Sequence, residues 1–388
     1  MIGLTKVILV TYPDAFRLEE AKSLAESLQN KIVKVFTQKY LDRAEYGMGS
    51  GKAEEIKHFM KEHSVDEIQQ LIVDEHLTTR QIHNLEKLTQ LQVIDRERLI
   101  LNIFSSRATT TESKLQIELA EIKYQFPRVR EASKIIAQAE SPGKGGMGEY
   151  VVDIKLRELK RQMSFIQQKL EYARRKRELY HRQRMETNLP VVSLVGYTSS
   201  GKTTLFNLLT DSKKEVSDDL FTTLSTTTRS LKLNNSNNNN KNNNNSKVLL
   251  VDTIGFISRL PHYMFDAFKS TLEESLGADL ILLLVDSSEE TQDIRMKYAS
   301  CWTVLGELGV NKSKVCVILT KYDDKNRRPE KIKEIANNLE LSNPMVISSK
   351  GGYGIRKLKI MIGQMLLSYH DHSEIITRKG TTLPEQLW

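Results

Sequence analysis

Short apolar runs separated by longer amphipathic stretches fill the chain from its start to about residue 105. Runs rich in Val, Ile and Leu are typical of buried strands, whereas apolar residues three and four apart indicate helices. Strands that alternate with helices favour an α/β fold with a small, mostly parallel sheet and helices on its faces. The predicted strands are Lys6–Val10, Ile32–Phe36, Leu71–Val73 and Gln92–Ile94, and the predicted helices are Glu19–Leu28, Ala53–Met60 and Thr79–Leu88.

From Thr111 onward the apolar period becomes helical and stays so. One helix follows Thr111, and Pro127 is expected to kink or restart it, because proline lacks an N–H and clashes with the preceding turn. A second long helix is predicted from Val152 to about Met185, after a flexible segment at Ser141–Tyr150. Apolar stripes on both helices predict an antiparallel coiled-coil arm. The stripe positions are Leu115, Leu119, Ile122 and Phe126 in the first helix, and Leu159, Met163, Ile166, Leu170 and Ala173 in the second.

A strand, a glycine-containing loop and a helix follow one another between Pro190 and Leu209. The loop satisfies the pattern G-x-x-x-x-G-K-[ST], which is typical of a phosphate-binding P-loop when it stands between a strand and a helix. Its glycines let the backbone approach the phosphates, its lysine reaches the β and γ oxygens, and its threonine offers a hydroxyl to Mg²⁺. The predicted nucleotide-binding residues here are Gly196, Tyr197, Thr198, Ser199, Ser200, Gly201, Lys202, Thr203 and Thr204.

Three further motifs follow apolar runs and point to a guanine nucleotide. An acid after the strand Lys247–Val251 can hold Mg²⁺ through water, and the glycine three residues later can sense a γ-phosphate. The carboxylate of Asp323 can accept from both N1–H and the exocyclic amine of guanine, a donor pair that adenine lacks. A serine-rich loop after Met345–Ile347 suits backbone contacts with the base. The predicted residues are Asp252, Thr253, Ile254 and Gly255; Thr320, Lys321, Tyr322 and Asp323; and Ser348, Ser349 and Lys350.

Two stretches have a less specific pattern. The loop Gly47–Lys52 resembles a phosphate loop but fails its spacing, because Tyr46 and Ala53 stand at positions that need Gly and Ser or Thr. A helix-opening turn is the favoured interpretation, with a weak anion or RNA contact as the alternative. The asparagine-rich tract Asn234–Asn245 is low in complexity and is predicted to lengthen the tip of a hairpin.

Charge and composition narrow the expected partners and compartment. The formal net charge is +8, and the segment Lys155–Glu186 holds eleven Lys or Arg against four Glu. A solvated helix face would explain this, but the run Arg174, Arg175, Lys176 and Arg177 on a projecting arm favours contact with RNA phosphates. The two cysteines have no CxxC spacing, and no apolar run is long enough to span a bilayer. We therefore expect a reduced, cytoplasmic monomer without membrane insertion.

Five further stretches have a distinctive sequence: Asp95–Leu101, Lys114–Ala120, Asp219–Arg229, Asp252–Phe256 continuing to His262, and Ala267–Glu274. Together they resemble the HflX GTPases over roughly residues 1 to 370, and the first two match the N-terminal domain of that family. The resemblance implies an N-terminal α/β subdomain with a helical arm, followed by a Ras-like P-loop G domain that uses GTP, GDP and Mg²⁺. It also implies association with the large ribosomal subunit through its rRNA, which in bacterial members extends to splitting stalled ribosomes.

The resemblance also assigns a switch segment. Thr223 would be a Mg²⁺ ligand beside Thr203, and the nucleotide-binding residues of this segment would be Phe221, Thr222, Thr223, Leu224 and Ser225. Family members usually carry Asn-Ala where this loop has Ser199 and Ser200, which puts potassium-assisted hydrolysis in question. They also usually carry Asn where Thr320 stands, and this departure is expected to loosen the base pocket. Phe256 occupies the position where many P-loop GTPases have a water-orienting Gln. No catalytic residue is assigned, and hydrolysis is expected to be slow alone and stimulated by the ribosome.

The expected domains are residues 1–105 for the α/β subdomain, 106–187 for the arm, 188–370 for the G domain and 371–388 for a C-terminal tail. The leading hypothesis is a GTP-hydrolysing switch that associates with the large ribosomal subunit and serves in splitting or rescuing ribosomes. One alternative is an RNA-binding or ribosome assembly factor in which nucleotide is mainly structural. Another is a P-loop phosphotransferase, against which the motifs at 252–255 and 320–323 argue.

Overall fold

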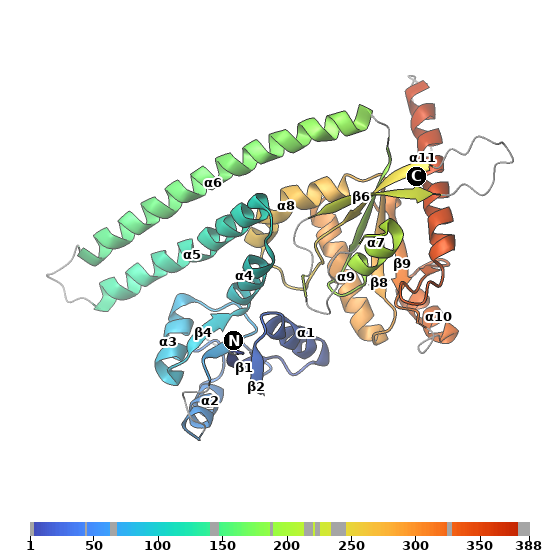
Figure 1. The fold of residues 1–388 in the computed structure, drawn as a ribbon. Coiled ribbons are helices and arrows are strands. Elements are labelled where there is room, and N and C mark those ends of the chain that lie inside the picture. The colour runs from blue at the N-terminus through green and yellow to red at the C-terminus, as the bar shows by residue number, and fades with distance from the viewer. Residues whose placement is uncertain are drawn as a thin grey trace, which may run out of the picture. The chain divides into compact units, whose positions relative to one another are not determined.

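The computed structural model of the 388-residue chain describes residues 4–42, 45–62, 68–139, 147–186, 189–212, 220–221, 226–233, 246–323 and 328–378. The chain forms two compact units (Figure 1). The first contains Met1–Tyr180 together with Ser217–Ser225 and Arg259–Ser270, and the second contains the remainder. Two short segments that the second unit flanks along the chain, residues 217–225 and 259–270, therefore belong to the first unit.

The first unit has a four-stranded parallel sheet with the order β2-β1-β3-β4. This arrangement confirms the four strands, the three helices and the parallel sheet predicted for the first hundred residues. The strands are β1 (Lys6–Thr11), β2 (Lys31–Thr37), β3 (Gln70–Val73) and β4 (Gln92–Asp95), and the helices are α1 (Ala15–Glu26), α2 (Ser50–Glu62) and α3 (Thr79–Thr89).

The core of this sheet explains the loop Gly47–Lys52. Strand residues Ile8 and Leu71 pack with Ile56 of α2, all fully buried, so α2 must begin close to the sheet. Gly47 has φ +67°, and a Cβ there would lie 2.2 Å from Leu77 Cδ2, so glycine is required. The loop is a helix-opening turn, as favoured from the sequence, and Lys52 Nζ lies 2.6 Å from Glu55 Oε2.

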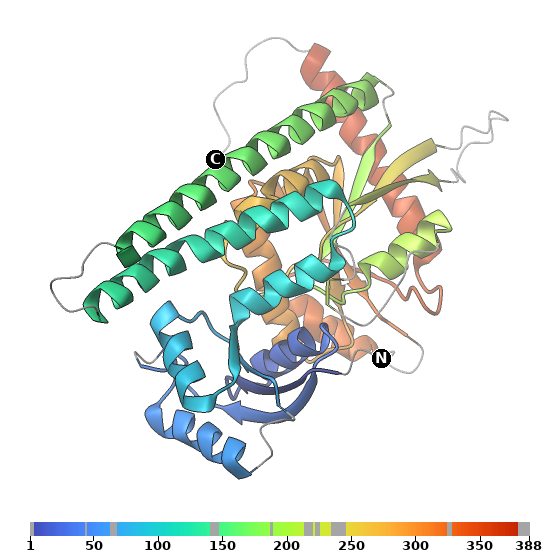
Figure 2. The same ribbon diagram turned by 60° about the vertical axis from the view of Figure 1, so that its left-hand side comes forward.

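Three helices follow the sheet: α4 (Arg96–Arg107), α5 (Thr111–Ala139) and α6 (Met147–Glu186). The last two run side by side as an arm (Figure 2). Their shared core confirms the predicted seam and consists of Leu119, Ile122, Leu159 and Ile166, with Leu115, Phe126, Val129, Met163 and Leu170 packed against it.

Two details of the arm differ from the sequence-based prediction. A restart at Pro127 is wrong, because α5 continues through this proline. Proline removes one helical hydrogen bond, but Phe126 and Val129 pack into the arm core on either side of it, and this packing maintains the helix. Helix α6 begins at Met147, inside the segment Ser141–Tyr150 predicted as flexible, and residues 140–146 of that region lie outside the described residues.

The second unit has a six-stranded sheet with the order β10-β9-β8-β5-β7-β6, in which only the β6–β7 pair is antiparallel. Its strands are β5 (Val191–Gly196), β6 (Thr227–Leu233), β7 (Ser246–Asp252), β8 (Leu280–Asp286), β9 (Val315–Thr320) and β10 (Met345–Val346). Its helices are α7 (Lys202–Thr210), α9 (Thr291–Glu307), α10 (Pro329–Asn338) and α11 (Ile355–Arg378), while α8 (His262–Leu276) spans the boundary between the units.

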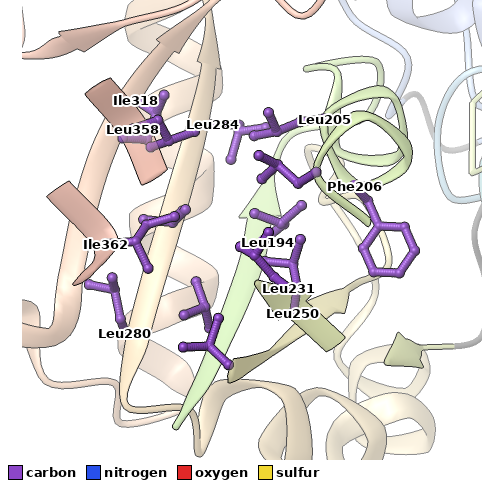
Figure 3. Close-up of a cluster of buried hydrophobic side chains, with 14 of the residues drawn as sticks. Leu194, Leu205, Phe206, Leu231, Leu250, Leu280, Leu284, Ile318, Leu358 and Ile362 are labelled. Atoms are coloured by element: carbon purple, nitrogen blue, oxygen red, sulfur yellow. The ribbon is translucent and has the colours of Figure 1, made fainter. Parts of the chain in front are cut away.

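The core of the second unit lies between β5, β8 and the helices α7 and α11 (Figure 3). Leu194 and Leu284 from the central strands meet Leu205 and Phe206 of α7, and all four are almost fully buried. This packing fixes the start of α7 at the end of β5, which is where the predicted phosphate loop stands.

The hairpin β6–β7 is paired up to Leu233 and Ser246, so the asparagine-rich tract Asn234–Asn245 joins these two paired strands. This pairing supports the predicted hairpin, and the tract itself lies outside the described residues. Within the described residues, no helix combines the length and the apolar composition needed to cross a membrane.

Candidate functional site: a nucleotide-binding loop and its neighbours

The loop from Gly196 to Lys202 closes tightly between β5 and α7. Gly196 has φ +151°, and a Cβ there would lie 2.4 Å from the carbonyl oxygen of Leu284, so no larger residue fits. Gly201 forms the N-cap of α7 with φ +91°, and Ser199 also has positive φ. The backbone N–H groups at the start of α7 can therefore face an anion at the positive end of the helix dipole.

Lys202 is the first residue of α7, and it is buried. Its Nζ donates to the carbonyl oxygens of Tyr197, at 2.7 Å, and Gly196, at 3.1 Å. Burial lowers the pKa of Lys202 to about 8, although the Asp252 carboxylate opposes this shift. An ammonium held by two loop carbonyls can exchange these contacts for phosphate oxygens without being moved far.

Two hard oxygen ligands meet beside Lys202. Thr203 Oγ1 donates to Asp252 Oδ2 at 3.2 Å, and both residues are buried. A hydroxyl and a carboxylate are the donors that a small divalent cation prefers, so this pair fits such a cation. Thr223, the second predicted metal ligand, lies outside the described residues, as do Thr222, Leu224 and Ser225.

The segment after β7 is joined to the P-loop by its backbone. Phe256 N–H donates to Gly196 O at 3.0 Å, and Phe256 O accepts from Thr198 N–H at 2.8 Å. A Cβ on Gly255 would lie 2.9 Å from Thr198 Cγ2 and 3.1 Å from Lys202 Nζ, so glycine allows this close approach. The Phe256 side chain is buried. It packs within the fold and offers no hydrogen bond to a water molecule.

The motifs predicted to recognise the base converge at the ends of β9 and β10. Thr320 Oγ1 is buried and donates to the carbonyl oxygen of Ser200 at 2.8 Å, with Val285 O also within reach at 3.2 Å. Ser348 Oγ donates to Asp323 Oδ1, and Gly351 N–H donates to Ser348 Oγ at 2.8 Å. The structure therefore brings Asp323 together with the serine loop and connects Thr320 to the phosphate loop.

Other predicted residues bond to neighbouring elements. Thr253 Oγ1 donates to Leu194 O at 2.7 Å, and Lys321 Nζ lies 2.6 Å from Asp286 Oδ2. Arg174, Arg175 and Lys176 lie exposed on α6, where Arg175 pairs with Glu171 at 3.1 Å, while the side chain of Arg177 lies outside the described residues.

Sequence reasoning missed a cluster in the first unit around Asp74, at the carboxyl end of β3. Arg259 donates to Asp74 Oδ2 at 2.9 Å and to Glu75 Oε2 at 3.2 Å. Tyr263 OH donates to Glu97 Oε2 at 2.9 Å. The acids directly after β3 are the signal that indicates a polar cluster there, because the carboxyl ends of parallel strands share one edge of a sheet.

Phe221 and Phe268 also belong to the first unit, and both rings pack edge-on against Phe104 of α4, with centroids 4.8 and 5.1 Å away. Leu220 N–H donates to Ser27 Oγ at 3.1 Å. Phe221 is predicted from the resemblance to bind the nucleotide, and within the first unit its ring packs in this aromatic cluster.

Comparisons with known proteins match this organisation. Residues 16–105 match the family described as GTP-binding GTPase N-terminal, residues 107–184 match GTP-binding GTPase Middle Region, and residues 191–345 match 50S ribosome-binding GTPase. A relative from Methanocaldococcus jannaschii, named GTPase HflX, is 36% identical over 90% of this chain and 83% of its own length. The chain belongs to the HflX family of GTPases. It is therefore a GTP-hydrolysing enzyme.

Further relatives support the assignment to this family. GTPase HflX of Hyperthermus butylicus is 33% identical over 90% of this chain and 92% of its own length. Among solved structures, the crystal structure of SsGBP in complex with GDP is similar with a TM-score of 0.52 and 26% identity, covering 94% of this chain and 99% of that one. The sequence-based resemblance to the HflX family is confirmed.

Proposed function

We propose that this HflX-family GTPase is a switch whose nucleotide state governs its association with the large ribosomal subunit. The observation that carries the proposal is the match of residues 191–345 to a family described as 50S ribosome-binding GTPase, which supports the large subunit as partner. The hydrogen bond from Thr320 Oγ1 to Ser200 O supports the nucleotide site, because it connects the predicted base-recognition motif with the phosphate loop. Splitting or rescue of ribosomes would be the cellular outcome of this association.

The guanine nucleotide would be held from both ends. Lys202 would exchange the carbonyls of Gly196 and Tyr197 for β- and γ-phosphate oxygens, while the N–H groups at the start of α7 face the same charge. Asp323, positioned by Ser348, would accept from the two guanine donors. Thr320 holds the loop before Asp323 to the loop before Lys202, so both ends keep their spacing.

We propose Mg²⁺ as the divalent cation, held by Thr203 Oγ1 and Thr223 with Asp252 acting through water. When bound, Mg²⁺ neutralises the charge that develops on the phosphates during transfer. The chain's own contribution is to hold the hydroxyl of Thr203 and the carboxylate of Asp252 side by side in a buried place, and to position Lys202 for the γ-phosphate.

Hydrolysis by the protein alone should be slow. The side chain of Phe256 is buried and cannot orient water, so the stimulating group or ordering contact would come from the partner. We also propose that Arg174, Arg175, Lys176 and Arg177 on α6 contact rRNA phosphates.

Single-turnover GTP hydrolysis with and without purified large subunits tests this function, together with cosedimentation in a GTP analogue and in GDP. We expect stimulation by subunits, and tighter association in one nucleotide state. Fast hydrolysis without stimulation would contradict the switch. Equal cosedimentation in both nucleotide states would instead favour an RNA-binding assembly factor in which nucleotide is structural.

A further inference from the structure

Helix α6 carries a second apolar stripe that the arm core does not use. Its members are large hydrophobic side chains on the surface, and their exposed fractions are 60% for Val151, 48% for Ile154, 57% for Phe165, 73% for Tyr172 and 61% for Leu179. Phe165, Tyr172 and Leu179 follow one another at seven-residue intervals, so they lie on one face of the helix. We call the five residues together the outer stripe.

The outer stripe is distinct from the seam with α5. At 100° per residue, its centre lies roughly 120° around α6 from the line through Leu159 and Ile166, which are buried in the arm core. Residues of a two-helix seam cannot reach that far around a helix, so the outer stripe contributes nothing to holding α5 and α6 together. Two exposed aromatic rings on such a face need an explanation other than arm stability.

Basic side chains share this face. Arg161, Lys169 and Lys176 are exposed and lie within about 60° of the stripe by helical spacing. Lys169 Nζ lies 4.2 Å from the centroid of the Phe165 ring, so a cation and a ring already form one local unit. Among the side chains of α6 that the structure describes, the acid in the same sector is Glu158, whose Oε1 accepts from Gln162. The outer face is therefore aromatic and positively charged.

We propose that this outer face of α6 binds unpaired RNA, with Phe165 and Tyr172 stacking on bases while Arg161, Lys169 and Lys176 meet phosphates. The proposal deepens, and rests on, the proposed association with the large ribosomal subunit. The two rings are about 10 Å apart along the helix, so each takes a base of its own. Bases inside a duplex are already stacked on one another, so exposed rings of this kind select single-stranded loops and ends.

Charge argues against a second copy of the chain as the occupant of this face. A self-associated pair would bring two faces with the same excess of Lys and Arg together, and like charges at an interface oppose association. RNA supplies the opposite charge and flat apolar surfaces at the same time. Both features of the outer face are satisfied by that one partner.

The test uses the full-length protein with a labelled, unstructured oligoadenylate and with an RNA duplex of equal length. In the ring variant, Phe165→Leu with Tyr172→Leu, apolar bulk is kept and the rings are lost. We expect oligoadenylate affinity to fall by about 10- to 100-fold and duplex affinity to stay unchanged, because stacking on a ring contributes per unpaired base. The salt dependence should keep its slope, since no charge has been removed.

Two further variants control the interpretation. Tyr40→Leu removes an exposed tyrosine whose ring also has a lysine nearby, with Lys39 Nζ 5.4 Å from the centroid, and should leave both affinities unchanged. Replacing Arg161, Lys169 and Lys176 by Gln should instead lower the salt slope by up to about 2. Unchanged GDP affinity and melting temperature in each variant show that the fold is intact.

An unchanged oligoadenylate affinity in the ring variant would overturn the proposal. So would a wild-type dimer, seen by sedimentation, that the ring variant disperses, because the face would then be an interface between copies. If the ring variant binds RNA normally while wild type still cosediments with large subunits in a nucleotide-dependent way, this inference fails and the proposed function stands. If oligoadenylate binding depends on the rings but subunits are never bound, the proposed function fails and the RNA-binding face stands.

Discussion

Replacement of Thr320 by valine tests the connection between the two halves of the nucleotide site. Thr320 is 2% exposed, and its hydroxyl donates to Ser200 O at 2.8 Å. Valine has nearly the same shape but no hydroxyl, so the change removes this donor and leaves the carbonyl oxygens of Ser200 and Val285 without it. An unsatisfied buried polar group costs about 1–3 kcal/mol, which corresponds to roughly 5- to 150-fold in an equilibrium constant. If the whole penalty falls on binding, GDP affinity falls by this range. If part of it falls on folding, the loss of affinity is smaller.

The assay is equilibrium binding of a fluorescent GDP analogue, accompanied by urea unfolding. Thr320→Ser is the matched control, because it keeps the hydroxyl and should remain within about threefold of wild type. We expect Thr320→Val to lose GDP affinity, by no more than that range, together with stability of the second unit. If Thr320→Val binds GDP and unfolds like wild type, the hydroxyl does not hold the two loops together.

Three other predictions follow from single side chains. Asp323→Asn should weaken GTP binding by at least ~10²-fold and favour xanthine over guanine nucleotide in competition assays, because the amide presents a donor to the guanine donors. Cys301 is buried, and burial raises the pKa of its thiol to about 12, so mass spectrometry should find it unalkylated at neutral pH until the protein unfolds; rapid alkylation of the native protein would contradict this. Burial lowers the pKa of Lys202 to about 8, and bound phosphates favour its ammonium, so GDP affinity should be flat below pH 7 and fall by up to tenfold per unit above pH 8; constant affinity up to pH 9 would count against it.

The features that could be predicted are those that depend on the spacing of residues close together in the sequence. The stripe of Leu115, Leu119 and Ile122 sets one side of the arm core, and the glycine pattern at Gly196 requires a turn that only glycine fits. Contacts between distant segments cannot be predicted from such spacing. Arg259 and Asp74 are separated by 185 residues, and the sequence around either residue does not identify the other as its partner. The restart predicted at Pro127 is wrong for a related reason, since tertiary packing of the arm outweighs the local preference of proline.

The cluster around Asp74 bears on what the first unit's sheet can bind. In open parallel sheets, ligands ordinarily bind at the carboxyl ends of the strands where the strand order reverses, which here lies between β1 and β3. Asp74 at this point is buried and already accepts from Thr11 Oγ1, from Arg96 and from Arg259. Arg259 adopts φ +51°, an uncommon conformation for a residue with a side chain, while making these contacts. The crevice that would receive a small molecule in other α/β sheets is thus filled by a side chain of the same chain.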